Sequence, residues 1–430
     1  MSADTKNCPS NSLIATFSSP LSHSLTPVQK AHAPEEPTHQ KWSQALLKWY
    51  DQNRRDLPWR NTRDPYAILV SELMLQQTQV TTVIPYYLRW LELFPSFHAL
   101  ARASLEDVLK TWEGLGYYRR ARYLYETANI VSERYGGELP DDAEILKRLP
   151  GIGDYTLGAL LSIAFGRREP AVDGNVRRVA SRFWALSDDL GKGRALRNLK
   201  ETIRAAMPED RPGDFTQALM ELGGTVCTPS APRCNMCPLN VYCIAYQTDR
   251  VAEFPAVKEA PKKKTERRRM WIIEWDGKLF LQKRTEKLLE GMWEFPHERL
   301  EEKHLVQNTV EHLVRTDQEG VQVFRERTLS DGNVLKKDRY GVPMQLFQNV
   351  FPASSAAIQV KHVRRIGFVK HVFTHLIWDI EVFAVALDMQ GAIEQSFEKN
   401  WFTEETLSRL PLAVPIQKAW KLWKRKCKNS

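Results

Sequence analysis

Two carboxylates in the sequence, Glu72 and Asp173, are candidate functional residues, and the surroundings of Glu72 favour acid–base chemistry. Glu72 lies in an apolar helical run, where its neighbours about one turn away are Ile68, Leu69 and Leu75. A carboxyl group on such a face is shielded from water and keeps its proton to higher pH, as a general acid needs near neutrality. The alternative is a glutamate at the rim of the protein that pairs with a basic side chain.

Asp173 follows a stretch, Leu149–Thr156, that is typical of a tight turn between two helices. Pro150 presets one backbone angle, and Gly151 and Gly153 can both take a positive φ, so the chain can reverse within a few residues. Backbone N–H groups at the start of the second helix would then form a phosphate-binding site. The alternatives are an ordinary turn between helices and, for Asp173, an ordinary helix N-cap.

Four of the six cysteines form a cluster with the spacing C-x6-C-x2-C-x5-C. They are Cys227, Cys234, Cys237 and Cys243. Four clustered thiolates can bind zinc or an iron–sulfur cluster, and the usual zinc pattern of two separated C-x2-C pairs differs from this spacing. The other two cysteines are isolated, so we expect no secreted disulfide framework and a reducing compartment.

Length and charge set wider limits on the protein. A chain of 430 residues is longer than one usual domain, so we expect at least two. The formal charge of +9 suits a polyanionic partner but does not identify one. No apolar run reaches the length of a membrane span, so we expect no membrane partner.

The elements that position the carboxylates are predicted to be helices. We expect residues 1–40 to be disordered and folded sequence to begin near Lys41. Asp64 is a predicted N-cap, with Pro65 at the first position of a helix that continues to Val80 and carries Glu72. Gln76 and Gln77 follow on this helix as long amides suited to reading or filling a base stack.

Further helices are predicted over residues 85–135 and, before the cysteines, over Phe215–Gly224. The segment Gly114–Arg122 contains Tyr117 and several arginines in a glycine-flanked turn. Aromatic rings beside arginines can stack on bases and hold phosphates. A plain helix connection with a solvated basic face is the alternative.

The pattern changes after a basic, proline-containing linker at residues 254–269. Met270–Trp275 and Lys278–Lys283 flank Asp276-Gly277, which predicts a β-hairpin, and His371–Ala386 alternates like a strand. The C-terminal part is therefore expected to be α+β. Its Gly291–Pro296 stretch resembles the entry to a Nudix box, but the glutamate-rich Mg²⁺-binding helix does not follow, and 320–362 give no usable pattern.

These motifs resemble the MutY-type adenine DNA glycosylases of the helix-hairpin-helix, or endonuclease III, superfamily. The resemblance implies an all-α glycosylase domain at 41–253 and, at 270–430, a Nudix-like domain that recognises the lesion. It implies a [4Fe–4S] cluster on the loop at 227–243. The partner implied is double-stranded DNA with adenine opposite 8-oxoguanine or guanine, from which adenine is removed to leave an abasic site.

The resemblance also assigns roles to single residues. Glu72 matches the family's general acid, Asp173 its catalytic aspartate, and Asn175 the amide after it. Tyr155 stands where endonuclease III has the lysine that attacks the sugar, and a tyrosine has no amine for that reaction. The residues expected at the DNA are Gln76, Gln77, Tyr117, Gly151, Gly153, Phe373, Thr374 and His375.

Among these, Phe373-Thr374-His375 resembles the family's F-S-H loop that contacts 8-oxoguanine, with Thr in place of Ser. A strand whose apolar residues pack a core is the alternative for this segment. Two other functions remain open at this point, a bifunctional glycosylase/AP lyase and a non-catalytic lesion-binding protein. We expect a monomer, located in the cytoplasm or nucleoid of a bacterium or in the nucleus or mitochondria of a eukaryote.

Overall fold

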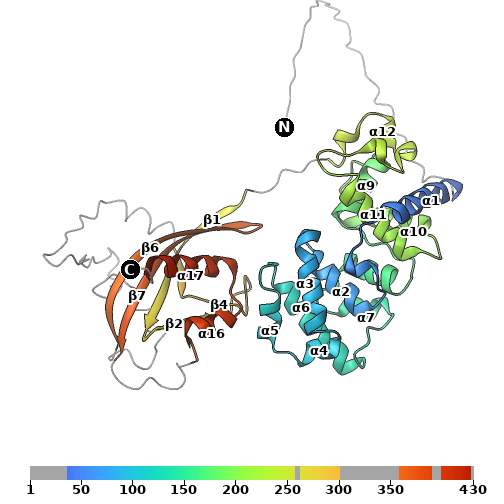
Figure 1. Ribbon diagram of the computed structural model, residues 1–430. Coiled ribbons are helices and arrows are strands. Elements are labelled where there is room, and N and C mark those ends of the chain that lie inside the picture. Colours follow the sequence, from blue (N-terminus) through green and yellow to red (C-terminus); the bar gives the residue numbers. More distant parts are fainter. Residues whose placement is uncertain (1–35, 257–261, 301–357, 390–398, 428–430) are drawn as a thin grey trace, which may run out of the picture.

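A computed structural model of the chain describes residues 36–256, 262–300, 358–389 and 399–427. Figure 1 shows a helical domain followed by a domain built on a sheet. This is the predicted fold class, all-α and then α+β. No helix within the described ranges is long and apolar enough to cross a membrane.

The helical domain extends from α1 to η5. Its elements are α1 (Glu36–Asn53), η1 (Pro58–Arg60), α2 (Pro65–Leu75), α3 (Val80–Leu93), α4 (Phe97–Arg102), α5 (Leu105–Thr111), α6 (Arg119–Arg134), α7 (Ala143–Arg148), α8 (Asp154–Ala159), the π-helical turn η2 (Leu160–Ala164), α9 (Gly174–Phe183), α10 (Gly193–Ala206), α11 (Pro212–Thr225), η3 (Cys234–Met236), η4 (Asn240–Tyr242), α12 (Ile244–Gln247) and η5 (Val251–Glu253). Two apolar cores hold it together, one around α2 to α8 and the other joining α1, α9, α10 and α11.

The second domain carries a twisted mixed sheet with strand order β6-β7-β1-β2-β8, and β5 also pairs with β1. Its elements are β1 (Lys264–Trp275), β2 (Lys278–Phe280), β3 (Gln282–Lys283), β4 (Trp293–Glu294), β5 (His297–Arg299), β6 (Ile358–Val372), β7 (Leu376–Met389), β8 (Trp401–Phe402), α16 (Glu404–Arg409) and α17 (Val414–Cys427). Strands β1 and β7 run parallel in the middle of the sheet, and α17 packs against β6.

The predicted hairpin at Asp276-Gly277 is confirmed. Both residues have positive φ, 48° and 69°, and Trp275 pairs with Lys278 across the turn. A two-residue turn with positive φ at both positions matches the twist of the flanking strands, which is why this dipeptide predicts it.

Several predicted boundaries are wrong. Helix α1 begins at Glu36, inside the expected tail. Helix α2 ends at Leu75 rather than Val80, because Gln77 has a φ of 58° that no α-helix accommodates. Strand β1 begins at Lys264, so part of the expected linker is strand.

The segment His371–Ala386, predicted as one strand, is a hairpin. It contains the end of β6, a turn at Phe373-Thr374-His375 and most of β7. The backbone N–H of Phe373 donates to the Leu376 carbonyl at 2.8 Å and closes the turn. Alternation of apolar residues continues through so short a turn, so the pattern alone does not reveal it.

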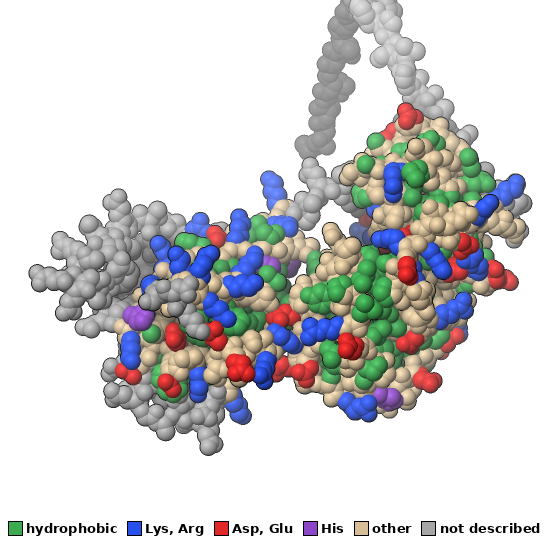
Figure 2. Space-filling view, viewed as in Figure 1, with side chains coloured by type: hydrophobic (Ala, Val, Ile, Leu, Met, Phe, Trp, Pro, Cys, Tyr) green, Lys and Arg blue, Asp and Glu red, His purple; other side chains and the backbone are tan. Residues whose placement is uncertain are grey.

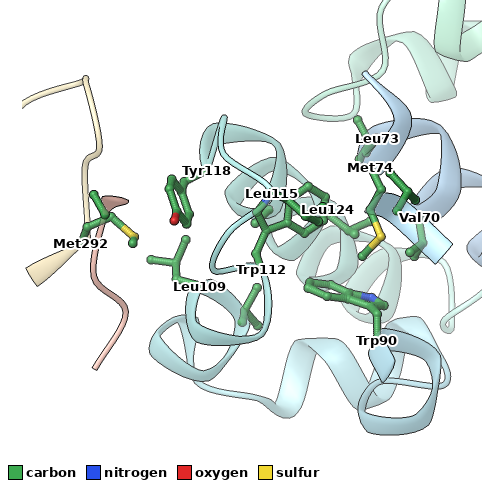
Figure 3. Close-up of a cluster of buried hydrophobic side chains, with 14 of the residues drawn as sticks. Val70, Leu73, Met74, Trp90, Leu109, Trp112, Leu115, Tyr118, Leu124 and Met292 are labelled. Carbon is green, nitrogen blue, oxygen red and sulfur yellow. The ribbon is translucent and has the colours of Figure 1, made fainter. Parts of the chain in front are cut away.

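The two domains contact each other through α5, the loop after it and α6. In Figure 3 the side chain of Met292, from the second domain, points toward Leu109 and Tyr118 of the first. Beside this apolar contact, the Glu113 carboxylate accepts from the Leu412 backbone N–H at 2.9 Å and from the Gln417 amide at 2.8 Å. The larger apolar core therefore continues from one domain into the other.

Because Glu113 is a shared acceptor at this interface, its removal should loosen the docking of the second domain. In Glu113→Ala we expect the Leu412 amide to exchange hydrogen about 5-fold faster, as for the loss of one hydrogen bond. Hydrogen-exchange mass spectrometry over 406–420 measures this. Glu405→Ala, which removes an exposed intrahelical ion pair with Arg409, should leave the exchange unchanged. Equal exchange in Glu113→Ala and wild type would contradict the role.

Candidate active site

Helix α2 holds Glu72 in a dry environment. Its N-cap, Asp64, accepts hydrogen bonds from the N–H groups of Tyr66 and Ala67, with Pro65 at the first helical position, as predicted. Every residue from Tyr66 to Met74 is buried. The helix is therefore buried on all sides, and a carboxylate within it is largely shielded from bulk water.

Sequence reasoning missed the residue that completes α2 at its other end. Arg120 is only 6% exposed, and its guanidinium donates to the carbonyls of Leu73 (2.7 Å), Met74 (2.9 Å) and Gln76 (2.5 Å). Burial lowers the pKa of Arg120 to about 10, so it stays charged at neutral pH. In the sequence it was one arginine in a basic segment, and nothing there distinguished a buried one.

Glu72 is 5% exposed and accepts a hydrogen bond of 2.6 Å from the Tyr155 hydroxyl. Burial raises the pKa of Glu72 to about 7; the Tyr155 hydrogen bond opposes this rise and the nearby Asp173 adds to it. A carboxyl group with this pKa can carry a proton at neutral pH, which is the property predicted for it.

Tyr155 is the second residue of α8, directly after the hairpin. Gly151 has a φ of 82°, as expected, but Gly153 has a φ of −88° and an extended backbone as the N-cap of α8. Of the two glycines that can take a positive φ, only Gly151 therefore does so. Gly153 is nevertheless exposed, and a Cβ there would meet nothing within 4 Å, so the start of the helix is open to a phosphate.

Asp173 is the N-cap of α9, as the alternative interpretation of this residue predicts. Its carboxylate accepts from the Val176 N–H at 2.7 Å and from the Asn175 amide at 2.9 Å. Arg178 in turn donates to the Asn175 carbonyl oxygen at 2.8 Å. Burial raises the pKa of Asp173, and these donors with the Arg178 charge oppose the rise.

Helix α9 also connects Asp173 to the cysteine segment. Arg178 donates to the backbone carbonyls of Gly223 and Cys227, both at 2.8 Å. Arg182, one turn further on, donates to the carbonyl of Thr228 at 2.7 Å. The cysteine segment and the candidate catalytic aspartate are thus held by the same helix.

The four predicted ligands Cys227, Cys234, Cys237 and Cys243 are free thiols that interact electrostatically with one another. Burial raises the pKa of Cys237 to about 12. Within the described residues, no group of three or more His, Cys, Asp or Glu side chains is arranged to hold a single metal ion.

The residues predicted at the DNA come from both domains. The Gln76 amide lies 3.5 Å from the Thr156 hydroxyl, and Gln77 is exposed. Tyr117 has a φ of 49°, is 45% exposed and shares a hydrogen bond with the hydroxyl of Thr374. The predicted wedge of the first domain and the predicted reading turn of the second therefore meet.

Within that turn the three predicted residues differ. Phe373 is half-buried, with its ring 4.9 Å from that of Trp378 and 4.4 Å from that of His371. Thr374 and His375 are exposed. The turn is thus supported by a packed ring and presents two polar side chains.

A buried carboxylate that pairs with two arginines, which the sequence did not indicate, lies on α11 next to Met220. Glu221 of α11 is 1% exposed and accepts from Arg55 and Arg60 at 2.7 Å each. Burial raises the pKa of Glu221, but hydrogen bonds from the two arginines outweigh it and bring the pKa to about 2. The neighbouring Met220 places its sulfur 3.8 Å from the Tyr155 hydroxyl.

Net charge does not locate the DNA surface by itself. On the face shown in Figure 2, Lys and Arg side chains are spread over both domains and interspersed with acidic ones. The hairpin, the exposed Gln77 and the turn of the second domain are more specific indicators, because each presents donors or rings at a defined place.

Known proteins resemble this chain over most of its length. A family model described as HhH-GPD superfamily base excision DNA repair protein matches residues 70–205. The adenine DNA glycosylase of Mus musculus is 34% identical over 433 residues, which cover 88% of this chain and 77% of the mouse protein. That of Homo sapiens is 33% identical over 435 residues, 88% of this chain and 73% of the human protein.

The chain belongs to the adenine DNA glycosylases. It is a hydrolase of N-glycosyl bonds that removes adenine in base excision repair, so the family and activity predicted from the sequence are confirmed. Among solved structures, a thermostable thymine-DNA glycosylase matches 49% of this chain and 98% of its own, with 28% identity and a TM-score of 0.46.

The burial of Glu72 should make the fold less stable at high pH than at low pH. The folded-state pKa is higher than the ordinary one, so the folded protein binds the proton more tightly and loses stability as pH rises through about 7. Glu72→Gln lacks this ionisation. Its free energy of unfolding, relative to wild type, should increase by about 2 kcal/mol between pH 5 and pH 8.5.

Urea unfolding at the two pH values measures this difference. Glu144→Gln, which changes an exposed carboxylate in α7, is the matched control and should show no such increase. A pH-independent difference for Glu72→Gln would mean that Glu72 ionises as an exposed glutamate does.

Proposed function

We propose that the protein hydrolytically removes adenine that lies opposite 8-oxoguanine or guanine, with Glu72 as general acid and Asp173 as the carboxylate that stabilises the sugar cation. The observation that carries this proposal is the buried Glu72, which accepts a hydrogen bond of 2.6 Å from the Tyr155 hydroxyl and lies within electrostatic reach of Asp173, the N-cap of α9. One carboxyl group is prepared to hold a proton, and the other is surrounded by donors.

The chemistry follows from these two environments. Adenine must leave the base stack to reach them, at a cost of a few kcal/mol. Glu72 then protonates N7 of the base, so that it departs as neutral adenine, and C1′ becomes oxocarbenium-like. Ionised Asp173 faces this cation and either stabilises it or bonds to it, as the nucleophile does in retaining glycosidases. Water completes the reaction and leaves an abasic site.

Hydrogen bonding supports opposite protonation states for the two groups. The Val176 N–H and the Asn175 amide donate to Asp173 and favour its charged form. Glu72 has one donor, the Tyr155 hydroxyl, in apolar surroundings that favour its neutral form. Two carboxyl groups with distinct environments are the usual basis for separate acid and anion roles.

We also propose that the protein does not cleave the DNA strand. A β-lyase of this superfamily forms a Schiff base through a lysine at the hairpin, and this chain has Tyr155 there. The bifunctional alternative lacks its nucleophile at this position. We further propose that the protein acts as a monomer, since the residues assigned to the reaction all lie within one chain.

Removing either carboxyl function should abolish most catalysis. Glu72→Gln cannot donate a proton and Asp173→Asn removes the charge, so each should slow single-turnover adenine release by at least ~10². In wild type the rate should fall above about pH 7, where Glu72 loses its proton. Adenine release on a duplex with A opposite 8-oxoguanine, measured from pH 5.5 to 9, tests both expectations.

Both variants should still bind the mispaired duplex, which separates loss of chemistry from loss of folding. Strand cleavage should require added alkali in every case. A Glu72→Gln protein that releases adenine at the wild-type rate would exclude Glu72 as the acid.

We propose that the second domain selects the base opposite adenine through the turn at Phe373-Thr374-His375. Phe373 supports the turn by packing on Trp378, while Thr374 and His375 are exposed polar groups that can bond to a base edge. A good polar contact to the edge that distinguishes two bases contributes ~1–3 kcal/mol. His375→Ala and Thr374→Val should therefore reduce activity on A:8-oxoguanine at least ~5-fold more than on A:G.

Glycosylase rates on the two duplexes give this ratio directly. Val372→Thr, at an exposed position beside the turn, is the matched control and should leave the ratio as in wild type. Equal losses on both duplexes, together with a lower Tm, would show that the turn stabilises the domain and that the lesion is read elsewhere.

We propose that the cysteine segment holds a [4Fe–4S] cluster. Four free thiols lie within electrostatic reach of one another, which agrees with the predicted ligand set. Four cysteine thiolates are the usual ligands of such a cluster. When bound, the cluster would supply a rigid anchor for this segment, which Arg178 and Arg182 join to α9.

Anaerobically purified protein should contain about four irons and four sulfides per chain, as one [4Fe–4S] unit requires. Cys237→Ala should lower this content and the Tm, because that side chain packs against the apolar core of α1, α9, α10 and α11. Cys427→Ala, at a free cysteine in the other domain, should change neither. Stoichiometric zinc without iron would contradict the assignment.

A further inference from the structure

The Tyr155 hydroxyl lies between two acceptors on different helices. Its oxygen is 2.6 Å from Glu72 Oε2 and 3.8 Å from the sulfur of Met220, which belongs to α11. Among the described residues these two groups are its hydrogen-bond partners. A hydroxyl has one proton, so it can donate to only one of the two at a time.

The choice of acceptor depends on the protonation of Glu72. When Glu72 is ionised, the Tyr155 O–H donates to the carboxylate. When the proton on Glu72 sits on Oε2, the oxygen that faces Tyr155, the Glu72 O–H can donate to the lone pairs of the Tyr155 oxygen. The Tyr155 proton must then turn away, and the thioether of Met220 is in position to accept it.

We propose that Met220 is a positioning residue for the general acid, whose sulfur accepts the Tyr155 O–H while Glu72 holds the proton that it will transfer to the base. The inference rests on the proposed role of Glu72 as that acid. Only Glu72 gains or loses a proton in this change. The Tyr155 hydroxyl keeps its proton and rotates, so that it donates to the Met220 sulfur instead of the carboxylate.

The charges around this group do not depend on Met220. Asp173, from the N-cap of α9, is the charged group that acts on both Glu72 and Tyr155. Arg178 faces Asp173 through Asn175. Helices α2, α8 and α11 contribute Glu72, Tyr155 and Met220 themselves, so a change at Met220 alters a hydrogen bond and leaves the facing charges in place.

Packing alone is the competing explanation for Met220. Its side chain is half-buried and packs against both apolar cores of the helical domain. Leucine preserves nearly all of that volume and apolar character but has no sulfur acceptor. Met220→Leu therefore removes the proposed hydrogen bond with little disturbance of the packing.

Met220→Leu should favour the ionised form of Glu72. When Glu72 is protonated, the Tyr155 O–H donates to the Met220 sulfur, and leucine cannot accept that hydrogen bond. A thioether is a weak acceptor, so the pKa of Glu72 should fall by about half a unit. The decline of single-turnover adenine release with pH should move to lower pH by the same amount. Met207→Leu, at a buried methionine after α10, is the matched control and should show no shift.

A second measurement follows Glu72 without catalysis. In protein labelled with ¹³C at the glutamate carboxyls, the Glu72 signal is identified by its loss in Glu72→Gln and titrated in wild type and Met220→Leu. The shift should vanish when Met220→Leu is made in a Tyr155→Phe protein, because no hydroxyl then links the two groups.

Identical titrations in wild type and Met220→Leu would overturn the inference. So would a shift that persists in the Tyr155→Phe background, because it would arise from packing or dielectric effects. If Glu72→Gln kept the wild-type rate, the proposed acid role would fail, yet the carboxyl titration would still report whether Met220 and Glu72 are linked through Tyr155.

Discussion

The desolvation of Glu72 is the constraint on which the site depends. A carboxyl group with a pKa of about 7 requires a helix that is buried on every side, and α2 is buried from Tyr66 to Met74. Such a helix must also have its terminal backbone groups satisfied without water. Asp64 caps its first N–H groups, and the Arg120 guanidinium accounts for carbonyls at its end. The burial of Glu72 thus depends on two charged residues, Asp64 and Arg120, that bond to the two ends of α2 and lie far apart in the sequence.

The second carboxyl is prepared by the opposite means. Asp173 is partly buried, but three groups favour its anion: the Val176 N–H, the Asn175 amide and the Arg178 charge. Arg178 is shared with the carbonyls of Gly223 and Cys227, so the anion's position depends on the loop that carries the cysteines. A cluster there would act on catalysis through structure, since it would fix the segment from which Arg178 is held.

The sequence indicated the reacting groups better than their supports. Glu72 in an apolar helix, Asp173 after a hairpin and four cysteines are local patterns, and local patterns are readable. Arg120 contacts Gln76, which is 44 positions away, and Met220 contacts Tyr155, which is 65 positions away. No local sequence pattern records such pairs. The start of strand β1 was not predicted for the same reason. Its first residue, Lys264, lies in a charged segment and pairs with Leu376, which is distant in the sequence.

The contact between the domains bears on how one lesion is preferred over another. In the protein without DNA, the Tyr117 hydroxyl and the Thr374 hydroxyl are already bonded to each other. A base that enters between them must replace that hydrogen bond, so only the surplus over it contributes to binding. A base that bonds to only one of the two hydroxyls makes one hydrogen bond in place of the one that is lost, so its binding is not strengthened. A base that bonds to both hydroxyls makes one more hydrogen bond and binds more tightly. On the proposal that this turn reads the lesion, selectivity would be a difference between hydrogen bonds, and the docking of the domains, which includes the bonds of Glu113 to Leu412 and Gln417, would bear on it.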